Sequence, residues 1–441
     1  MKRLILAVVA VLAATVAAAP LVTGHVMETT LAEAGYFPGT RGVLSLELTD
    51  YQRGYLESQA RSELVIRLPE QEPIRLELRH RIDQLPGLDG RYATVHTRWQ
   101  LQDPELRDEL AQVFGHDVEF TLATALYLTG GTRSIGHVPA IERDGAAFSG
   151  ADLKLLTTAD RRFEYTLATN RFVIDDQAGS VRAGGQLSIE DLRLTAAGQV
   201  ADDGFPWESQ GRLKVGRIQV IEPAGRSFID HLSIGVDTGL DDDLWGFSVD
   251  YQIGEAAIEG ESFHDAQLRL AVERLDVAAL RVIARRIESL QELDGIGVDI
   301  DVEQAVDQVM RDELPALLNR GPRLAIEPAK VTTVEGDTEV MLSVEVPGGI
   351  LDGEPNPLMW MAMIGALVLE GSLQMPVALL EKQAAVQGRP GQIQELLAPL
   401  IEQGWVEIED DVLKTSVDFR QGSLKLNGKS ANQLLGMAFG G

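Results

Sequence analysis

Polar and apolar residues alternate along much of the first half of the chain. Apolar side chains occupy every second position between Ile74 and Arg79, and the same period runs from Tyr92 to Trp99. A period of two places the apolar side chains on one face of a strand. Similar runs, separated by turn-forming residues, cover 50–68, 118–128, 164–175, 185–189, 192–199, 212–220, 227–237, 247–253 and 267–275. The pattern predicts an antiparallel β-rich region over residues 25–265.

From residue 266 to residue 441 the pattern becomes mixed. Apolar residues at helical spacing alternate with strand-like runs, and helices are expected near 276–293, 302–319, 376–386 and 392–403. Gly321 and Gly404 follow two of these helices and favour left-handed caps. The order strand, helix, helix, glycine, strand, strand thus occurs twice, which indicates an apparent duplication; convergence on a common pattern is the alternative.

Together the two halves predict an α+β fold. Its main element is an extended, curved antiparallel sheet, because short alternating strands dominate the chain. The helix pairs must bury their apolar faces against this sheet.

The first residues have the pattern of an export segment. Lys2 and Arg3 precede an uncharged apolar run from Leu4 to Val22. Pro20 would follow the scissile bond of the best cleavage site and hinder processing, so residues 1–24 are either a signal peptide or an uncleaved membrane anchor. We therefore expect a location on the periplasmic side of the inner membrane, in a bacterial cell envelope.

Composition restricts the chemistry. The chain carries 67 acidic and 39 basic residues, a net charge of −28, which repels the phosphate backbone of nucleic acids. It contains no cysteine, so disulfides, thiolate catalysis and cysteine-ligated metals are excluded. We expect no nucleic-acid partner and no cofactor.

Local motifs give no catalytic or metal site. Asn427-Gly428-Lys429-Ser430 resembles the end of a phosphate loop, but the glycine required upstream is Ser423. The acidic run 241–243 lacks the spacing of a calcium loop and is typical of a hairpin turn. The histidines form no paired metal motif and are expected as surface or half-buried strand residues; they are His25, His80, His96, His116, His137, His231 and His264.

One apolar segment, 357–369, is rich in methionine. Met359, Trp360, Met361 and Met363 lie in it, and adaptable methionine side chains suit a surface for a partner chain or an apolar ligand. The segment is too short for a second membrane span, so the alternative is a buried strand or a helix leading into one.

The order of several short segments along the chain resembles the YdgA-like bacterial envelope proteins, a family of unknown function that includes YdgA and YihF. The resemblance implies an inner-membrane or periplasmic location and self-association, and it supplies no catalytic residues. The segments are the N-terminal run ending at Pro20, 51–55 with 58–60, 321–324 with Thr332 and 335–336, 400–404, and 421–428.

These observations favour a non-catalytic envelope protein that self-associates, as a dimer, or binds a partner through its sheet surface. The alternative is a carrier of lipid or another hydrophobic ligand in an apolar groove. A third class, an enzyme with a non-standard site, would need a cluster of polar residues in a cleft.

Overall fold

The fold comes from a computed structural model, which describes residues 44–66, 73–104, 107–108, 111, 120–143, 145–175, 185–201, 205, 207–223, 225–258, 260–295, 302–349, 357–386 and 392–434. The chain forms two compact units. Unit 1 comprises residues 1–206 with 220–223, and unit 2 comprises 207–219 with 224–441. Residue 265, where the sequence changes character, lies inside β15 of unit 2.

Unit 1 is an antiparallel sheet in which most strands pair with their neighbours in the chain. Its order is β1-β2-β3-β4-β5-β6-β9-β10-β11, and β8 pairs with β10 next to β9 and also with β7. The strands are β1 (Leu44–Gln52), β2 (Glu57–Ile66), β3 (Ile74–Asp83), β4 (Arg91–Leu101), β5 (Phe120–Tyr127), β6 (Thr132–Val138), β7 (Ile141–Arg143), β8 (Ala146–Phe148), β9 (Ala151–Thr157), β10 (Arg162–Asp175) and β11 (Gln186–Gln199).

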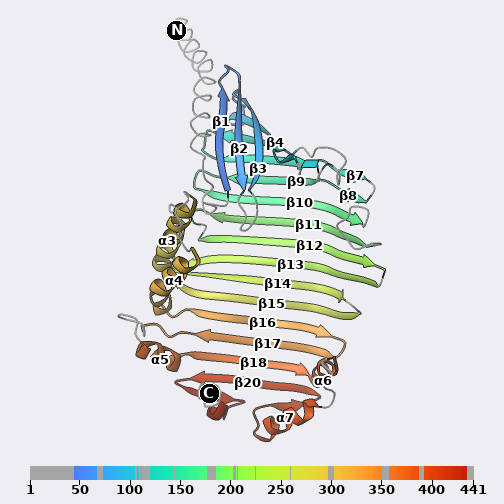
Figure 1. The fold of residues 1–441 in the computed structure, drawn as a ribbon, viewed down its shortest axis with the longest axis vertical. Coiled ribbons are helices and arrows are strands. Elements are labelled where there is room, and N and C mark those ends of the chain that lie inside the picture. Colours follow the sequence, from blue (N-terminus) through green and yellow to red (C-terminus); the bar gives the residue numbers. More distant parts are fainter. Residues whose placement is uncertain are drawn as a thin grey trace, which may run out of the picture. The chain divides into compact units, whose positions relative to one another are not determined.

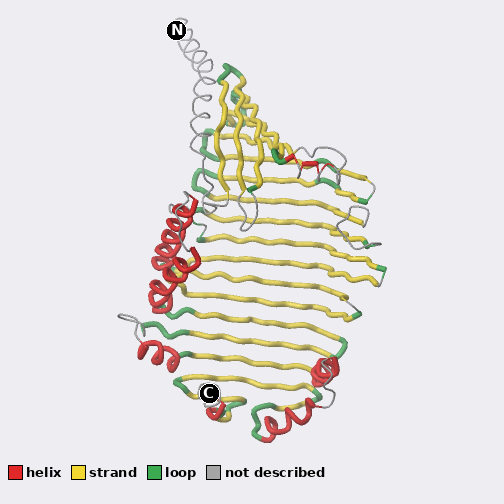
Figure 2. The backbone as a smooth tube through the Cα atoms, viewed as in Figure 1, coloured by secondary structure: helices red, strands yellow, loops and turns green. Residues whose placement is uncertain are grey.

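One face of β1 to β4 forms a buried core. Ala60, Ile82 and Val95 pack together there, because β2, β3 and β4 present alternate residues to the same side. In Figures 1 and 2 strands β1 to β4 run at a steep angle to the direction of β9, β10 and β11. The core also contains buried polar side chains, among them Ser58, Ser62, His80, Gln84 and Thr97.

Unit 2 contains a second antiparallel sheet with longer strands, in the order β13-β14-β15-β16-β17-β18-β20-β21. β19 and β22 pair with β20 and β21, and β12 is joined to β13 by Ser209–Thr238 and Arg217–Asp230 contacts. The strands are β12 (Glu208–Glu222), β13 (Gly225–Asp241), β14 (Leu244–Ile258), β15 (Glu261–Asp276), β16 (Arg323–Thr333), β17 (Gly336–Glu345), β18 (Val368–Pro376), β19 (Glu407–Glu409), β20 (Val412–Arg420), β21 (Ser423–Leu426) and β22 (Lys429–Ser430).

The helices of unit 2 lie at the ends of its strands. α3 (Val277–Gly295), α4 (Val302–Asn319) and α5 (Pro357–Ala366) are at one end, and α6 (Val377–Val386) and α7 (Gln392–Glu402) are at the other (Figure 1). Asp276 begins α3 by accepting a hydrogen bond from the Ala279 amide at 2.8 Å. Gly321 and Gly404 follow α4 and α7 with φ of +76° and +67°, which confirms both predicted caps.

Most predicted elements are confirmed, with two changes in the strands. The run 50–68 contains a turn that separates β1 from β2, and 185–189 and 192–199 form the single strand β11. Asp191 adopts φ of +54° inside β11, so an interruption in the sequence pattern does not end the strand. The order β15-α3-α4-β16-β17 is followed by β18-α6-α7-β19-β20. That this order reflects a duplication stays a prediction.

Candidate functional site

The sheet of unit 2 has one apolar and one polar face. Cross-strand pairing aligns Val236, Val249, Leu270, Ile326, Leu342, Gly371, Val417 and Leu426 in one row. The row beside it is Thr238, Phe247, Val272, Leu324, Val344, Leu369, Phe419 and Leu424. A third row is Ile234, Tyr251, Leu268, Ala329, Val340, Leu373 and Thr415. We call these three rows the apolar face; none of their residues carries a charge.

The neighbouring residue in each strand points to the opposite side. Asp237, Ser248, Ala271, Ala325, Ser343, Glu370, Asp418 and Lys425 form one row of this polar face. Charged and hydroxyl side chains on one face and aliphatic ones on the other are typical of a sheet whose apolar side is covered.

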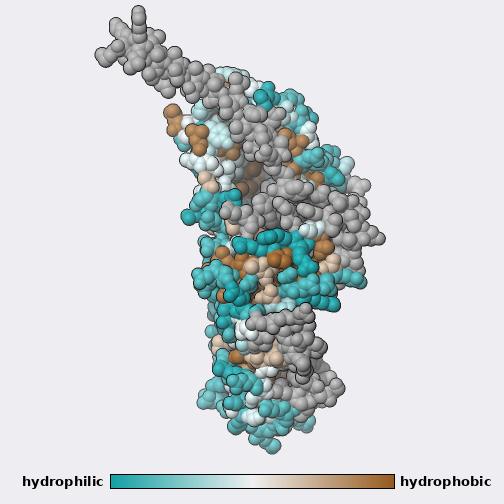
Figure 3. All heavy atoms as spheres, turned by 90° about the vertical axis from the view of Figure 1, so that its left-hand side faces the viewer, coloured by the Kyte–Doolittle hydropathy of each residue, from teal (hydrophilic) through white to brown (hydrophobic). Residues whose placement is uncertain are grey.

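The apolar face is nevertheless half-exposed in the described chain. Leu324 is 54% exposed, Val236 40% and Tyr251 38%, and no residue of the three rows is buried. All described strands of unit 2 belong to the same layer, so none of them packs across this face. At the strand ends that carry α3, which face the viewer in Figure 3, apolar atoms lie among hydrophilic ones at the surface.

The long helices bury their apolar residues mainly against each other. Ala279 and Ile283 of α3 pack against Val309 and Leu317 of α4. Leu280 of α3 packs against the same cluster. Leu275 of β15 also packs against this cluster, so the helix pair contacts the sheet at the end of that strand. That the helix pairs bury their apolar faces on the sheet stays a prediction.

Two local features shape the apolar face. Glu327 and Pro328 form a bulge in β16. Because of this bulge, the residues on either side of it, Ile326 and Ala329, both face the apolar side. Gly371 lies at the centre of one row, and a Cβ there would come within 3.0 Å of Val417 Cγ1 and 3.1 Å of Leu342 Cδ1. Glycine therefore lets the two flanking side chains approach each other. With strands about 4.8 Å apart, eight strands give the face a length of about 34 Å.

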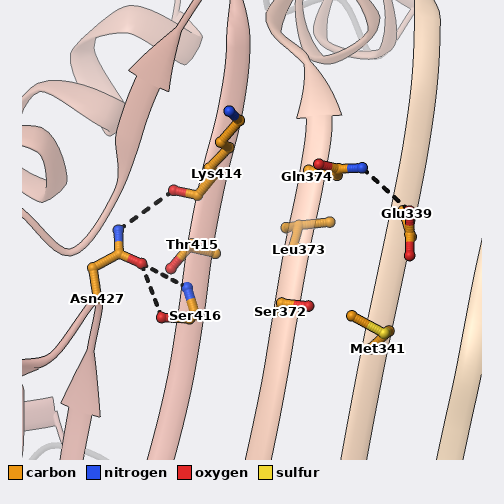
Figure 4. A pocket seen from close by; sticks show the side chains of 9 residues that line it. All are labelled: Glu339, Met341, Ser372, Leu373, Gln374, Lys414, Thr415, Ser416 and Asn427. Carbon is orange, nitrogen blue, oxygen red and sulfur yellow. Dashed lines mark hydrogen bonds between the residues drawn. The ribbon is translucent and has the colours of Figure 1, made fainter.

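Two shallow cavities lie over the same strands. The one in Figure 4 measures ≈290 Å³, and a second of ≈520 Å³ extends from it toward β16. In the first, Gln374 donates to Glu339 at 3.2 Å, and Asn427 Oδ1 accepts from the Ser416 amide at 2.7 Å. Lys414 bonds Glu409 at 2.7 Å. These polar groups of the first cavity satisfy one another.

A serine–histidine contact occurs in the core of unit 1. The ring nitrogens of His80 lie 3.1 Å from Ser62 Oγ and 2.9 Å from Thr97 Oγ1, and burial lowers the pKa of His80 to about 4. Ser62 is 1% exposed, so a substrate has no access to it. The expectation that the histidines are surface or half-buried residues is wrong for His80, because its hydroxyl partners allow a neutral ring to be buried.

The methionine-rich segment is helical. α5 contains Met359, Trp360, Met361 and Met363 and leads directly into β18, which agrees with the alternative of a helix preceding a strand. Met363 is half-buried and Ile364 is 45% exposed. The other three side chains lie outside the described ones, so their role as an apolar surface stays a prediction.

Other expectations concern residues that are only partly described. Within the described ranges, no group of three acidic or histidine side chains could hold a metal ion, and no helix has the length and hydropathy needed to cross a bilayer. The predicted signal or anchor, residues 1–24, lies outside the described residues. The acidic run 241–243 forms part of the β13–β14 hairpin, as expected.

The architecture is that of a β-rich protein, built from open antiparallel sheet with a few helices at the strand ends. The chain belongs to a family of bacterial proteins of unknown function, DUF945, whose family model matches residues 1–432. No curated protein and no solved structure matches the chain.

Proposed function

We propose that unit 2 binds lipid acyl chains, or a similarly elongated apolar ligand, along its apolar face. The proposal rests on one observation: three adjacent rows of uncharged side chains cross seven or eight strands and remain half-exposed. Monomeric proteins rarely leave contiguous apolar patches of this extent uncovered, and such patches mark interaction sites. The face, about 34 Å long, exceeds the roughly 15 Å thickness of one leaflet's hydrocarbon.

The chemistry of the face favours an acyl chain over a protein surface. Protein interfaces carry about one hydrogen bond per 100–200 Å². In the three rows, side-chain hydrogen-bonding groups are confined to Thr238, Tyr251 and Thr415. An acyl chain forms no hydrogen bonds, so a face with few hydrogen-bonding groups and no charge suits it.

A second copy of the chain is the other candidate for this face. Its extent, about 34 Å by three side-chain rows, approaches the roughly 800 Å² that each partner contributes to a standard interface. Self-association would make the protein a non-catalytic dimer of the bacterial envelope, in keeping with its likeness to the YdgA-like proteins. The anchor predicted in residues 1–24 would place either activity on the periplasmic side of the inner membrane.

The test is photo-crosslinking in membranes that contain the full chain and a phospholipid with a diazirine in its acyl chain. Peptide mass spectrometry then locates the adducts. We expect adducts on β15 to β20 in addition to any on residues 1–43. Leu342→Glu places a carboxylate at the centre of the apolar face and should reduce adducts on these strands about tenfold, because a buried unpaired charge is costly.

Ser343→Glu is the matched control. It adds the same charge one residue away, on the polar face, and should leave the adducts unchanged. Adducts confined to residues 1–43, or equal labelling in both variants, would contradict acyl-chain binding. Crosslinks between copies through β15 to β20, without lipid adducts, would assign the face to the dimer.

A further inference from the structure

Three neighbouring turns at one end of the unit 1 sheet carry exposed apolar side chains. The turns are 53–56 between β1 and β2, 84–90 between β3 and β4, and 128–131 between β5 and β6. Single exposed apolar residues are normal on a protein surface, whereas a group of them marks an interaction site. We call this group the apolar tip; its members are Tyr55, 49% exposed, Leu56, 47%, Leu85, 60%, Leu88, 111%, and Leu128, 78%.

Backbone hydrogen bonds hold the three turns in fixed positions. The Gln84 amide donates to the Leu56 carbonyl at 2.9 Å, and the Leu128 amide donates to the Gly90 carbonyl at 3.1 Å. Beneath the first two turns, the fully buried side chain of Gln84 donates to Ser58 Oγ. Successive turns are two strand spacings apart, so the apolar tip is a platform about 20 Å wide.

The charges of these turns are few and balanced. Arg53 and Asp89 are the charged residues of the three turns, so the turns are neutral on a chain whose net charge is −28. Asp89 Oδ1 turns back to the Arg91 amide at 3.3 Å and lies 4.0 Å from the Arg91 guanidinium. A polar border surrounds the tip, made by the first strand residues and the β9–β10 turn: Glu57, Asp83, Arg91, Asp160, Arg161 and Arg162.

We propose that the apolar tip inserts into the interfacial region of a lipid bilayer. Leucines that project from separate turns enter a fluid layer without fitted pockets, whereas a protein partner would need a complementary surface for each. Apolar side chains that bind at an interface reach about 5–10 Å into the headgroup and acyl boundary. The amphipathic ring of Tyr55 is of the kind enriched at that depth. The proposal does not depend on acyl-chain binding by unit 2.

The predicted anchor allows the same bilayer to be reached. The apolar run Leu4–Val22 and β1, which begins at Leu44, are separated by 21 residues, which reach at most about 75 Å. β1 rises about 30 Å from Leu44 to the first turn of the tip. Because the connection is longer than β1, a run inserted in the bilayer leaves the far end of β1 free to contact the surface of that bilayer.

The experiment uses the absence of cysteine from the chain. Thr129→Cys, exposed and next to Leu128, provides a single site for a fluorophore. The labelled full chain is reconstituted into phosphatidylcholine vesicles whose lipids carry a nitroxide quencher on the acyl chain. We expect quenching that persists in high salt, because the contact is apolar. A label on Ala140→Cys, exposed beyond the opposite end of β6, should be quenched little.

The double variant Leu85→Ser/Leu88→Ser should weaken docking of the labelled chain about 100-fold, since burial of each leucine is worth roughly tenfold. Both side chains are exposed, so thermal unfolding should not change. The matched control, Ile135→Ser/Leu156→Ser, removes two exposed aliphatic side chains from β6 and β9, away from the three turns, and should retain quenching.

Three outcomes would overturn the proposal. The first is equal quenching in the two double variants, and the second is loss of quenching in high salt, which would indicate adsorption through charge. The third is a label at Thr129→Cys that is shielded from iodide in water but not quenched by the acyl-chain nitroxide. Shielding that rises with protein concentration would then assign the apolar tip to a second copy of the chain.

Discussion

The buried imidazole of His80 makes the stability of unit 1 dependent on pH. In the folded chain burial lowers the pKa of His80 to about 4 from the ordinary value of 6.5. Between these two values the unfolded chain binds a proton that the folded chain does not bind. The stabilisation is therefore complete above pH 6.5 and is lost as the pH falls toward 4.

The size of the effect follows from the two pKa values. Linkage gives a loss of about 2 kcal/mol between pH 7 and pH 5, and about 3 kcal/mol when the pH reaches 4. The proton must enter a site in which Ser62 and Thr97 are the partners of the ring, with no carboxylate bonded to it. Protonation would leave a charge in the core that hydroxyl groups only partly stabilise.

Hydrogen exchange of peptides from β2 to β4, corrected for the intrinsic exchange rate at each pH, measures this loss within unit 1. The full chain should lose about 2 kcal/mol more protection between pH 7 and pH 5 than His80→Gln does. His137→Gln, at an exposed position beside Asp152, should behave like the unmodified chain. An equal loss in the unmodified chain and in His80→Gln would refute the reasoning.

Two further substitutions test the contacts that hold unit 2 together. Asp276→Ala removes the acceptor for the Ala279 amide at the start of α3 and a 2.9 Å contact with Arg320, and should cost about 1–2 kcal/mol in urea unfolding; an unchanged midpoint would show that α3 does not depend on its cap. Arg217→Gln leaves the buried carboxylate of Asp230 without its 2.6 Å partner and should cost about 2 kcal/mol, part of which Asp230→Asn should restore when added. If Asp230→Asn does not restore stability to the Arg217→Gln variant, Arg217 stabilises the fold through its packing on Phe228 instead.

Elements that depend on neighbouring residues were predictable from the sequence. Alternation over 74–79 and 92–99 defines β3 and β4, and the apolar spacing of Ile283 and Ile287 defines α3. Gly321 and Gly404 mark helix ends because few other residues adopt a positive φ without strain. Each of these signals lies within a few residues of the feature that it predicts.

Features that depend on register were not predictable. Arg61, Arg79 and Arg98 are 18 and 19 residues apart, and only the pairing of β2, β3 and β4 places them in one row. The apolar face likewise requires seven registers, two of which contain the bulge at Glu327 and Pro328. A one-residue slip in any strand would move its apolar side chains to the other face.

Pairing between consecutive strands has a consequence for how unit 2 can change in evolution. From β13 to β18 each strand pairs with the next strand along the chain, and the described strands form no second layer. Removing or inserting one complete hairpin would thus preserve the register and the sidedness of all remaining strands. Each inserted hairpin would lengthen the apolar face by about 10 Å. The length of the apolar face can therefore vary among family members in whole hairpins, much as repeat proteins vary in their number of repeats.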